Sequence, residues 1–227
     1  MRKNMFFRTA LAVGLVLVAG FIAFFITTDF KEVISGNAVA QVYIQETPHV
    51  NCSISLKEGI NHVSFFCEEG SRSLEEALID INNESLNYTS IYVFNAANLN
   101  DSWSSYNPSL PGWATQSISS LNRRAGYIVV MSTSGVYAND GYLFSNNNII
   151  LQKNWNFIGY PTNGVANISS VLSSINGKYV RVESYQVLNG SNYWRNYTPG
   201  NSGNLTIMES GIGYWMLMND SASITIG

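Results

Sequence analysis

An internal duplication constrains this chain more than any other feature of its sequence. Residues 54–137 and residues 149–226 contain the same kinds of short segments in the same order. Such a repeat indicates one supersecondary unit that is used twice. We therefore expect two tandem domains, residues 48–138 and residues 149–227, joined by a linker of residues 139–148.

Each copy is predicted to contain short strands and one helix. Apolar residues alternate around residues 60–65 and 155–160, which is typical of strands. Ser73 and Glu76 form a capping-box pattern, and Asn167 can cap the second helix. Apolar residues then recur at helical spacing, at Leu74, Ala77, Leu78 and Ile81 and at Ile168, Val171, Leu172 and Ile175. The expected fold class is α+β, mainly β, with a small antiparallel sheet and one helix in each domain.

Several of these landmarks form a longer ordered motif. The second copy reads Asn-Trp-Asn-Phe-Ile-Gly-Tyr-Pro at 154–161, Trp-Arg-Asn-Tyr-Thr-Pro at 194–199 and Gly-Ile-Gly-Tyr-Trp at 211–215. This set resembles a tandem repeat of secreted and cell-surface proteins of archaea and some bacteria, of the form Gly-Trp-Asn-Leu-Ile-Gly-x-Pro, helix, Trp-x-x-Tyr-x-Pro, Gly-x-Gly-Tyr-Trp. The first copy departs from it, with Ile60 in place of the first Trp and Ala-Gly-Tyr-Ile at 125–128. The resemblance implies a surface-exposed accessory or adhesive module and carries no catalytic residues.

A long apolar run near the amino terminus predicts a membrane anchor. Residues 9–28 carry no charge and follow three basic residues, Arg2, Lys3 and Arg8. A helix of this length spans the apolar core of a bilayer, about 30 Å, and the basic residues favour a cytoplasmic amino terminus. We expect residues 1–28 to be a retained single-pass transmembrane helix in contact with membrane lipid. Residues 29–47 would form a stalk, and the rest of the chain would be extracellular.

Two alternatives to a retained anchor remain open. Ala38-Val39-Ala40 has the small residues of a signal-peptide cleavage site, although it lies well beyond the apolar run. A pilin-like subunit would instead pack its apolar helix in the core of a filament. That alternative needs a processing site directly before the run, for which Arg8-Thr9-Ala10 is a poor match.

The chain contains two cysteines, Cys52 and Cys67. An extracellular location allows them to be oxidised. A hairpin with its turn at Gly59-Ile60 would place the two cysteines opposite each other on one face of the strands. We therefore predict a disulfide between Cys52 and Cys67.

Nine Asn-x-Ser/Thr sequons are candidate glycosylation sites on an extracellular surface. Many such sequons would arise by chance in a chain this rich in Asn, Ser and Thr. They begin at Asn51, Asn83, Asn87, Asn100, Asn167, Asn189, Asn196, Asn204 and Asn219.

No set of side chains in the sequence supports catalysis. The two histidines, His49 and His62, have no nucleophile motif beside them, and cysteines that pair leave no zinc site. The close carboxylate pairs, Glu68-Glu69 and Glu75-Glu76, are interpreted as solvated charges rather than as a glycosidase pair. We expect no enzyme activity, no metal and no cofactor.

The charge of the chain argues against nucleic acid as a partner. The chain has 12 Lys and Arg, three of them before the apolar run, so residues 29–227 carry 9 against 15 Asp and Glu, a net charge of −6. A basic patch or stripe, which nucleic acid requires, is missing from this composition.

The aromatic residues are the one feature of the sequence that suggests a binding site. Trp103 and Tyr106 recur as Trp194 and Tyr197, and Trp113 lies in an insertion of the first copy. Such rings either stack on sugars or, where they recur at matched positions, serve as core residues, and both interpretations remain open. The expected function is structural or adhesive display at the cell surface, with other surface proteins or glycans as partners. The alternatives are the pilin-like subunit and a carbohydrate-binding accessory module.

Overall fold

The computed structural model describes residues 16–18, 21–23, 49–79, 86–188, 191–201 and 203–227. The chain divides into two units, Met1–Glu46 and Thr47–Gly227. In the first unit, β1 (Val16–Val18) pairs with β2 (Phe21–Ala23), so the described residues of the apolar run form strands and not the expected helix. The remainder of that run and the expected stalk lie outside the described residues. Within the described part of the chain, no helix has the length and apolarity needed to cross a membrane.

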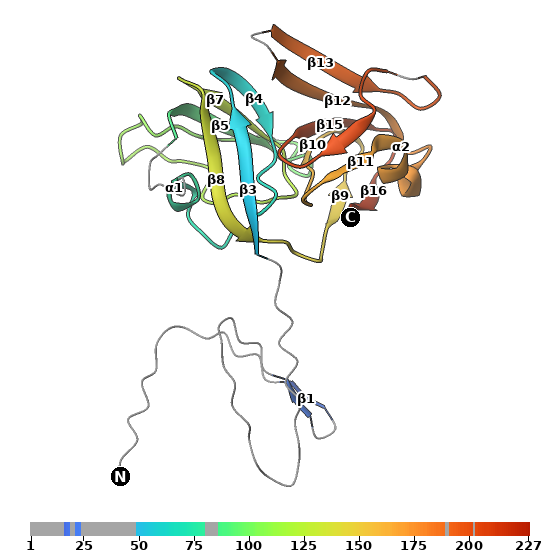
Figure 1. Ribbon diagram of the computed structural model, residues 1–227, viewed down its shortest axis with the longest axis horizontal. Coiled ribbons are helices and arrows are strands. Elements are labelled where there is room, and N and C mark those ends of the chain that lie inside the picture. Colours follow the sequence, from blue (N-terminus) through green and yellow to red (C-terminus); the bar gives the residue numbers. More distant parts are fainter. Residues whose placement is uncertain (1–15, 19–20, 24–48, 80–85, 189–190, 202) are drawn as a thin grey trace. The chain divides into compact units, whose positions relative to one another are not determined.

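The second unit contains the duplicated segments (Figure 1). The first copy consists of β3 (His49–Leu56), β4 (Gly59–Val63), α1 (Leu74–Ala77), β5 (Tyr88–Phe94), β6 (Trp103–Tyr106), β7 (Tyr127–Met131) and β8 (Gly135–Tyr142). The second consists of β9 (Asn148–Leu151), β10 (Asn154–Gly159), β11 (Val165–Asn167), α2 (Ile168–Val171), a 3-10 turn (Ser173–Ile175), β12 (Tyr179–Leu188), β13 (Ser191–Tyr197), β14 (Ile207–Glu209), β15 (Gly213–Met218) and β16 (Ala222–Thr225).

The two copies have the same strand order. Each has a four-stranded antiparallel sheet, β4-β7-β5-β6 in the first and β10-β15-β12-β13 in the second. Each also has a two-stranded pair, β3-β8 and β9-β16, and the second copy adds the pair β11-β14. The prediction of a mainly β chain with small antiparallel sheets is confirmed.

The register of the strands also matches between the copies. Gly59 lies opposite Met131, and Asn154, its equivalent in the second copy, lies opposite Met218. The pairing of β5 with β7 shifts register after Tyr88, and the pairing of β12 with β15 shifts at the equivalent place. Because even this irregularity recurs, the two copies are two uses of one fold.

Each copy encloses its own apolar core, to which its helix contributes. The capping box of Ser73 and Glu76 is formed, and the Asn167 side chain accepts a hydrogen bond from the backbone of Ser169, as predicted. Both helices are single turns and thus shorter than the predicted stripes. Buried residues from the stripes include Leu74, Ala77 and Leu78 in the first core and Ile168, Leu172 and Ile175 in the second.

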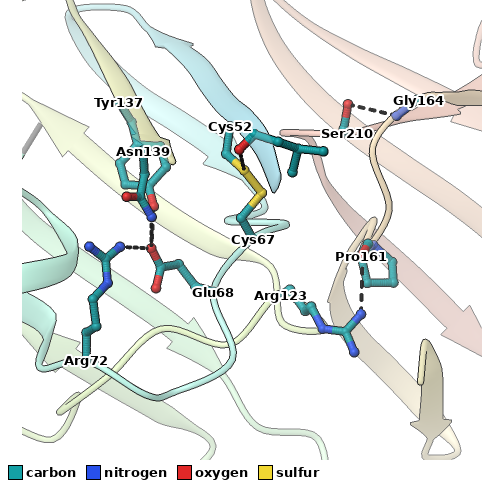
Figure 2. The surroundings of a disulfide bond; sticks show 11 residues. Cys52, Cys67, Glu68, Arg72, Arg123, Tyr137, Asn139, Pro161, Gly164 and Ser210 are labelled. Atoms are coloured by element: carbon teal, nitrogen blue, oxygen red, sulfur yellow. Dashed lines mark hydrogen bonds and ion pairs between the residues drawn. A yellow bond between two sulfur atoms is a disulfide. The ribbon is translucent and has the colours of Figure 1, made fainter. Parts of the chain in front are cut away.

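The predicted hairpin at Gly59-Ile60 is wrong, although the predicted disulfide is present. β3 pairs with β8 and β4 pairs with β7, so the two strands belong to different sheets. Gly59 has a φ of +89°, a left-handed conformation that lets the chain turn from one sheet to the next. The disulfide of Cys52 and Cys67 therefore ties β3 to the loop after β4, with 6.3 Å between the Cα atoms (Figure 2).

The two copies contact each other reciprocally. Val63 forms a β-bridge with Ile212, and their equivalents, Ile158 and Ala125, form the second bridge. In the same way β4 packs against β12 and β15, while β10 packs against β5 and β7. This exchange of equivalent partners is the pattern of an isologous interface, as found in symmetric dimers.

Glycines of the repeat motif allow the copies to approach closely. A Cβ atom on Gly159 would lie 2.7 Å from the carbonyl oxygen of Ala125, and one on Gly213 would lie 2.9 Å from that of Val63. The amide of Gly159 also donates a hydrogen bond to the carbonyl of Arg124 (2.9 Å). Two glycines of the repeat motif are thus residues at which the copies pair.

A buried arginine joins the copies through the segment between them. The Arg123 side chain is 1% exposed, pairs with Glu69 and donates to Asn147 and to the backbone of Asn146. It also donates to the carbonyl oxygen of Pro161 in the second copy (3.4 Å; Figure 2). Of the residues expected to form a linker, residues 139–142 belong to β8, and Asn146 and Asn147 are held by this arginine.

Candidate functional site

Aromatic side chains gather where the two sheets face each other. Successive side chains of a strand point to opposite sides, so each sheet gives one side to its own core and the other to the neighbouring copy. Phe157 of β10 stacks on Trp215 of β15, with 4.4 Å between the ring centroids and 10° between the planes. Phe94 of β5 reaches the same Trp215 from the first copy, at 5.3 Å. The two copies therefore share one aromatic layer.

Part of this layer opens as a groove of about 260 Å³, which we call the aromatic groove. It is lined by Phe94, Trp155, Glu183, Trp194 and Trp215. Three of the chain's five tryptophans are therefore in one groove. Phe94 comes from the first copy and the other four residues from the second, so pairing of the copies completes the groove.

The polar edge of the aromatic groove is formed by two residues of β12. Glu183 lines the groove, and its Oε1 atom lies 3.2 Å from Nε of Arg181. The guanidinium carbon of Arg181 lies 5.1 Å from the ring centroid of Trp155, a cation–π geometry. The groove therefore combines flat apolar walls with one carboxylate, the oxygens of which can accept hydrogen bonds.

The tryptophans that recur between the copies are exposed, so the interpretation as core residues is wrong for them. Trp103 is 46% exposed and Trp194 is 50% exposed, on the equivalent strands β6 and β13. The tyrosine of the first copy behaves differently, because Tyr106 is buried and its hydroxyl donates to Glu75 (2.7 Å). Burial and this hydrogen bond raise the pKa of Tyr106.

The remaining two aromatic candidates do not line the groove. Tyr197 is half-buried beside the second core and lies 6.4 Å from the ring of Tyr179. Trp113 is 86% exposed in its loop. Of the five aromatic residues singled out from the sequence, Trp194 alone lines the aromatic groove, and Trp103 extends its aromatic layer by contact with Trp215 at 5.9 Å.

A second hollow lies next to the aromatic groove. It has a volume of about 590 Å³, and six of its lining residues are Asn or Gln, so we call it the amide-lined cavity. These six residues are Asn95, Asn122, Asn146, Asn148, Gln152 and Asn156. Arg124 is the one charged residue of its lining, and this guanidinium already pairs with Glu69 at 2.6 Å. Phe94 lines both hollows.

His62 lies in the interface of the copies, among aromatic rings. Its ring centroid is 5.0 Å from that of Tyr185, 5.3 Å from Phe157 and 5.4 Å from Trp194. Burial lowers the pKa of His62 to about 4, because the charged form would lose its hydration. The described residues offer no hydrogen-bond partner to its Nδ1 atom. This histidine is therefore neutral near pH 7 and packs as an aromatic ring.

Of the carboxylates interpreted as solvated charges, Glu75 and Glu76 are exposed, as expected, whereas Glu68 is buried and has a structural role. Glu68 is buried and accepts hydrogen bonds from Tyr137 (2.5 Å) and Asn139 (2.9 Å) while pairing with Arg72, beside the disulfide (Figure 2). Burial, together with the Glu68 charge, raises the pKa of Tyr137. The Glu68 carboxylate is occupied by hydrogen bonds and an ion pair within the fold. It is therefore not placed to exchange a proton with a ligand.

The described sequon asparagines lie at the surface. Seven of them are exposed: Asn51, Asn87, Asn100, Asn167, Asn196, Asn204 and Asn219. Asn83 and Asn189 lie outside the described residues. Two of the exposed side chains also support local structure, since Asn167 caps α2 and Asn204 accepts from the amide of Asn196 (2.8 Å).

Sequence reasoning missed most of the aromatic groove. Phe94, Trp155, Glu183 and Trp215 were not among the predicted ligand-binding residues. The signal that would have found them is the alternation of β5, β10, β12 and β15, which sends these side chains to the side away from the core. Among the described residues, no group of three or more His, Cys, Asp or Glu is placed to hold a metal ion. Comparison of the chain with protein-family models, with curated proteins and with solved structures finds no match.

Proposed function

We propose that this chain is a membrane-anchored cell-surface protein that binds a neutral glycan in the aromatic groove and does not catalyse a reaction. The observation that carries the proposal is a groove with four aromatic walls and one carboxylate, built where two copies of a repeat meet. Ligand sites form preferentially at such junctions.

The chemistry of the groove suits a sugar ring. One face of a pyranose presents C–H groups and its rim presents hydroxyls, so it needs a flat apolar wall beside a hydrogen-bond acceptor. Trp155, Trp194 and Trp215 supply aromatic area, and Glu183 supplies the acceptor. The net charge of −6 carried by residues 29–227 would repel a negatively charged sugar, which favours a neutral ligand.

The exposure of the tryptophans supports binding over a purely structural role. A half-exposed tryptophan leaves much apolar area in water, which costs free energy that a core position would recover. Trp194 is exposed to this extent at the groove, and its equivalent Trp103 adjoins the same layer. Contiguous exposed apolar residues rimmed by polar ones are typical of interaction sites.

Display outside the cell is supported by the amino-terminal sequence and the disulfide. The apolar run of residues 9–28 and the basic residues before it favour a single-pass anchor with an external carboxy-terminal part. The disulfide of Cys52 and Cys67 suits an oxidising compartment. Full-length protein should therefore remain in membranes after a carbonate wash and be digested by protease added to intact cells. A product that is released by the wash would contradict the anchor.

A glycan array tests the binding function. The full chain, kept in detergent, is applied to neutral glycans, to anionic glycans and to immobilised proteins. The proposal predicts retention on a subset of the neutral glycans and none on the anionic ones. Retention on no glycan, or on proteins alone, would contradict it.

A further inference from the structure

We infer that the ligand is an extended oligosaccharide that fills the aromatic groove and the amide-lined cavity together. This inference rests on the proposed function and adds the length and polarity of the ligand. It assigns two kinds of subsite, one that stacks on sugar rings and one that binds hydroxyls.

The two hollows adjoin each other at one shared aromatic residue. Phe94 lines both, and Phe157 lines the cavity while its ring stacks on Trp215 of the groove. Phe94 is therefore the residue at which a ligand in the groove would meet the cavity. The cavity alone, at about 590 Å³, has the size of a small-molecule site.

The lining of the amide-lined cavity matches the hydrogen bonding of sugar hydroxyls. A hydroxyl both donates and accepts, and a carboxamide offers an NH₂ donor and a carbonyl acceptor in one side chain. Six Asn and Gln residues line the cavity. The side-chain carbonyl oxygens of the five Asn residues already accept hydrogen bonds within the fold, and the Asn156 NH₂ group donates to backbone carbonyls. The groups left to meet a ligand are the Gln152 carboxamide and the NH₂ groups of the other four Asn residues, Asn95, Asn122, Asn146 and Asn148. Arg124 is neutralised by Glu69 and also donates to the carbonyl of Asn146 (2.9 Å), so the site has no free charge to recruit an ionic ligand.

A substitution of Gln152 tests the cavity without removing a contact that holds the rest of the fold. Gln152 lines the cavity, and the hydrogen bonds that fix its backbone are made by the side chain of Asn156. Its equivalent in the first copy is Lys57, whose backbone is held in the same way by Asn61. Lys57 does not line the cavity, so Lys57→Ala is a matched control for Gln152→Ala.

The test measures affinity for a series of oligosaccharides, from disaccharide upward, of whichever neutral glycan the full chain retains. We expect affinity to rise with length and then to level off. Gln152→Ala should weaken binding of the longest oligosaccharide about 2- to 10-fold, the effect of one hydrogen bond, while leaving the disaccharide unchanged. Trp194→Ala should weaken every length, and Lys57→Ala none.

The outcomes separate this inference from the proposed function. Affinity that does not depend on length, or a Gln152→Ala variant that binds the longest oligosaccharide as the wild type does, would overturn the two-subsite ligand and leave the aromatic groove as a glycan site. Retention of no glycan at all would contradict the proposed function itself. Equal melting temperatures of Gln152→Ala and wild type show that a loss of affinity comes from the cavity.

Discussion

His62 and Phe157 hold equivalent positions in the two copies, and their rings meet across the interface at a centroid distance of 5.3 Å. The contact is edge-to-face, with 66° between the planes. The first copy thus has a titratable imidazole ring at the position where the second copy has the hydrocarbon ring of Phe157. Because the residues around it are Phe157, Tyr185 and Trp194, the interface accepts His62 only in its neutral form.

The first prediction concerns the loss of stability in acid. The pKa of His62 falls from 6.5 to about 4 on folding, so between these values the unfolded chain binds the proton and the folded chain does not. Proton binding to His62 of the unfolded chain therefore lowers the free energy of unfolding as the pH falls from about 6.5 towards 4, by about 3 kcal/mol in all. Above about pH 6.5 His62 is neutral in both states and has no such effect. Urea unfolding of His62→Phe should show a shallower pH dependence than that of wild type. The carboxylates contribute equally to the pH dependence of both proteins. Parallel plots of unfolding free energy against pH would therefore contradict the role of His62.

The second prediction concerns the close approach of the copies at Gly159. A methyl group at this position would overlap the backbone oxygens of Arg123 and Ala125 and the Ser64 hydroxyl. Gly159→Ala should therefore cost about 1–3 kcal/mol, as overpacking of a tight site does. The matched control is Gly112→Ala, because a Cβ there would meet nothing within 4 Å. Equal urea midpoints for the two variants would show that the interface is not closely packed.

The third prediction concerns the second copy on its own. Residues 149–227 include a complete apolar core, in which Leu172 is fully buried. We expect this fragment to unfold cooperatively in urea and, because its reciprocal interface is uncovered, to form a dimer whose midpoint rises with protein concentration. Leu172→Ala should cost about 2–5 kcal/mol, while Ser170→Ala at an exposed position should change little. A non-cooperative curve would mean that the two copies share one cooperative fold.

The fourth prediction concerns the disulfide. It closes a loop with a sequence separation of 15 residues, for which the chain-entropy model gives about 3 kcal/mol of stabilisation. Reduction should lower the melting temperature of wild type and leave that of the Cys52→Ser, Cys67→Ser double variant unchanged. Mass spectrometry without reduction should find the two peptides linked. Both thiols reacting with an alkylating reagent in the native protein would contradict the bridge.

Local signals predicted those parts of the fold that depend on nearby residues. The capping of α1 by Ser73 and Glu76 and the apolar stripe of α2 depend on contacts within a few residues, and they could be predicted from spacing. The partner of β3 could not, because β8 lies far away in the sequence and the nearer β4 seemed the natural neighbour. Sheet pairing is a choice among distant strands that periodicity alone does not resolve.

The residues of the aromatic groove were not brought together from the sequence, for a related reason. Phe94 and Trp215 come from different copies and become neighbours only when the copies pair. The repeated Trp103 and Trp194 suggested core residues because recurrence is expected of residues that maintain a fold. Their exposure follows from their place on strands β6 and β13, which end the two sheets. A residue that recurs in both copies can therefore lie on the surface that the paired copies form rather than in a core.

The most direct test of glycan binding in the aromatic groove is a calorimetric titration of the full chain with the neutral glycan that it retains. It compares Trp194→Ala, which removes a wall of the aromatic groove, with Trp113→Ala, which removes the tryptophan that is most exposed and lies outside the groove. Loss of one stacking ring should weaken binding about 5-fold or more, from a contribution of about 1 kcal/mol or above. We expect this loss for Trp194→Ala and an unchanged affinity for Trp113→Ala. Wild-type affinity in Trp194→Ala, or a loss confined to Trp113→Ala, would contradict it.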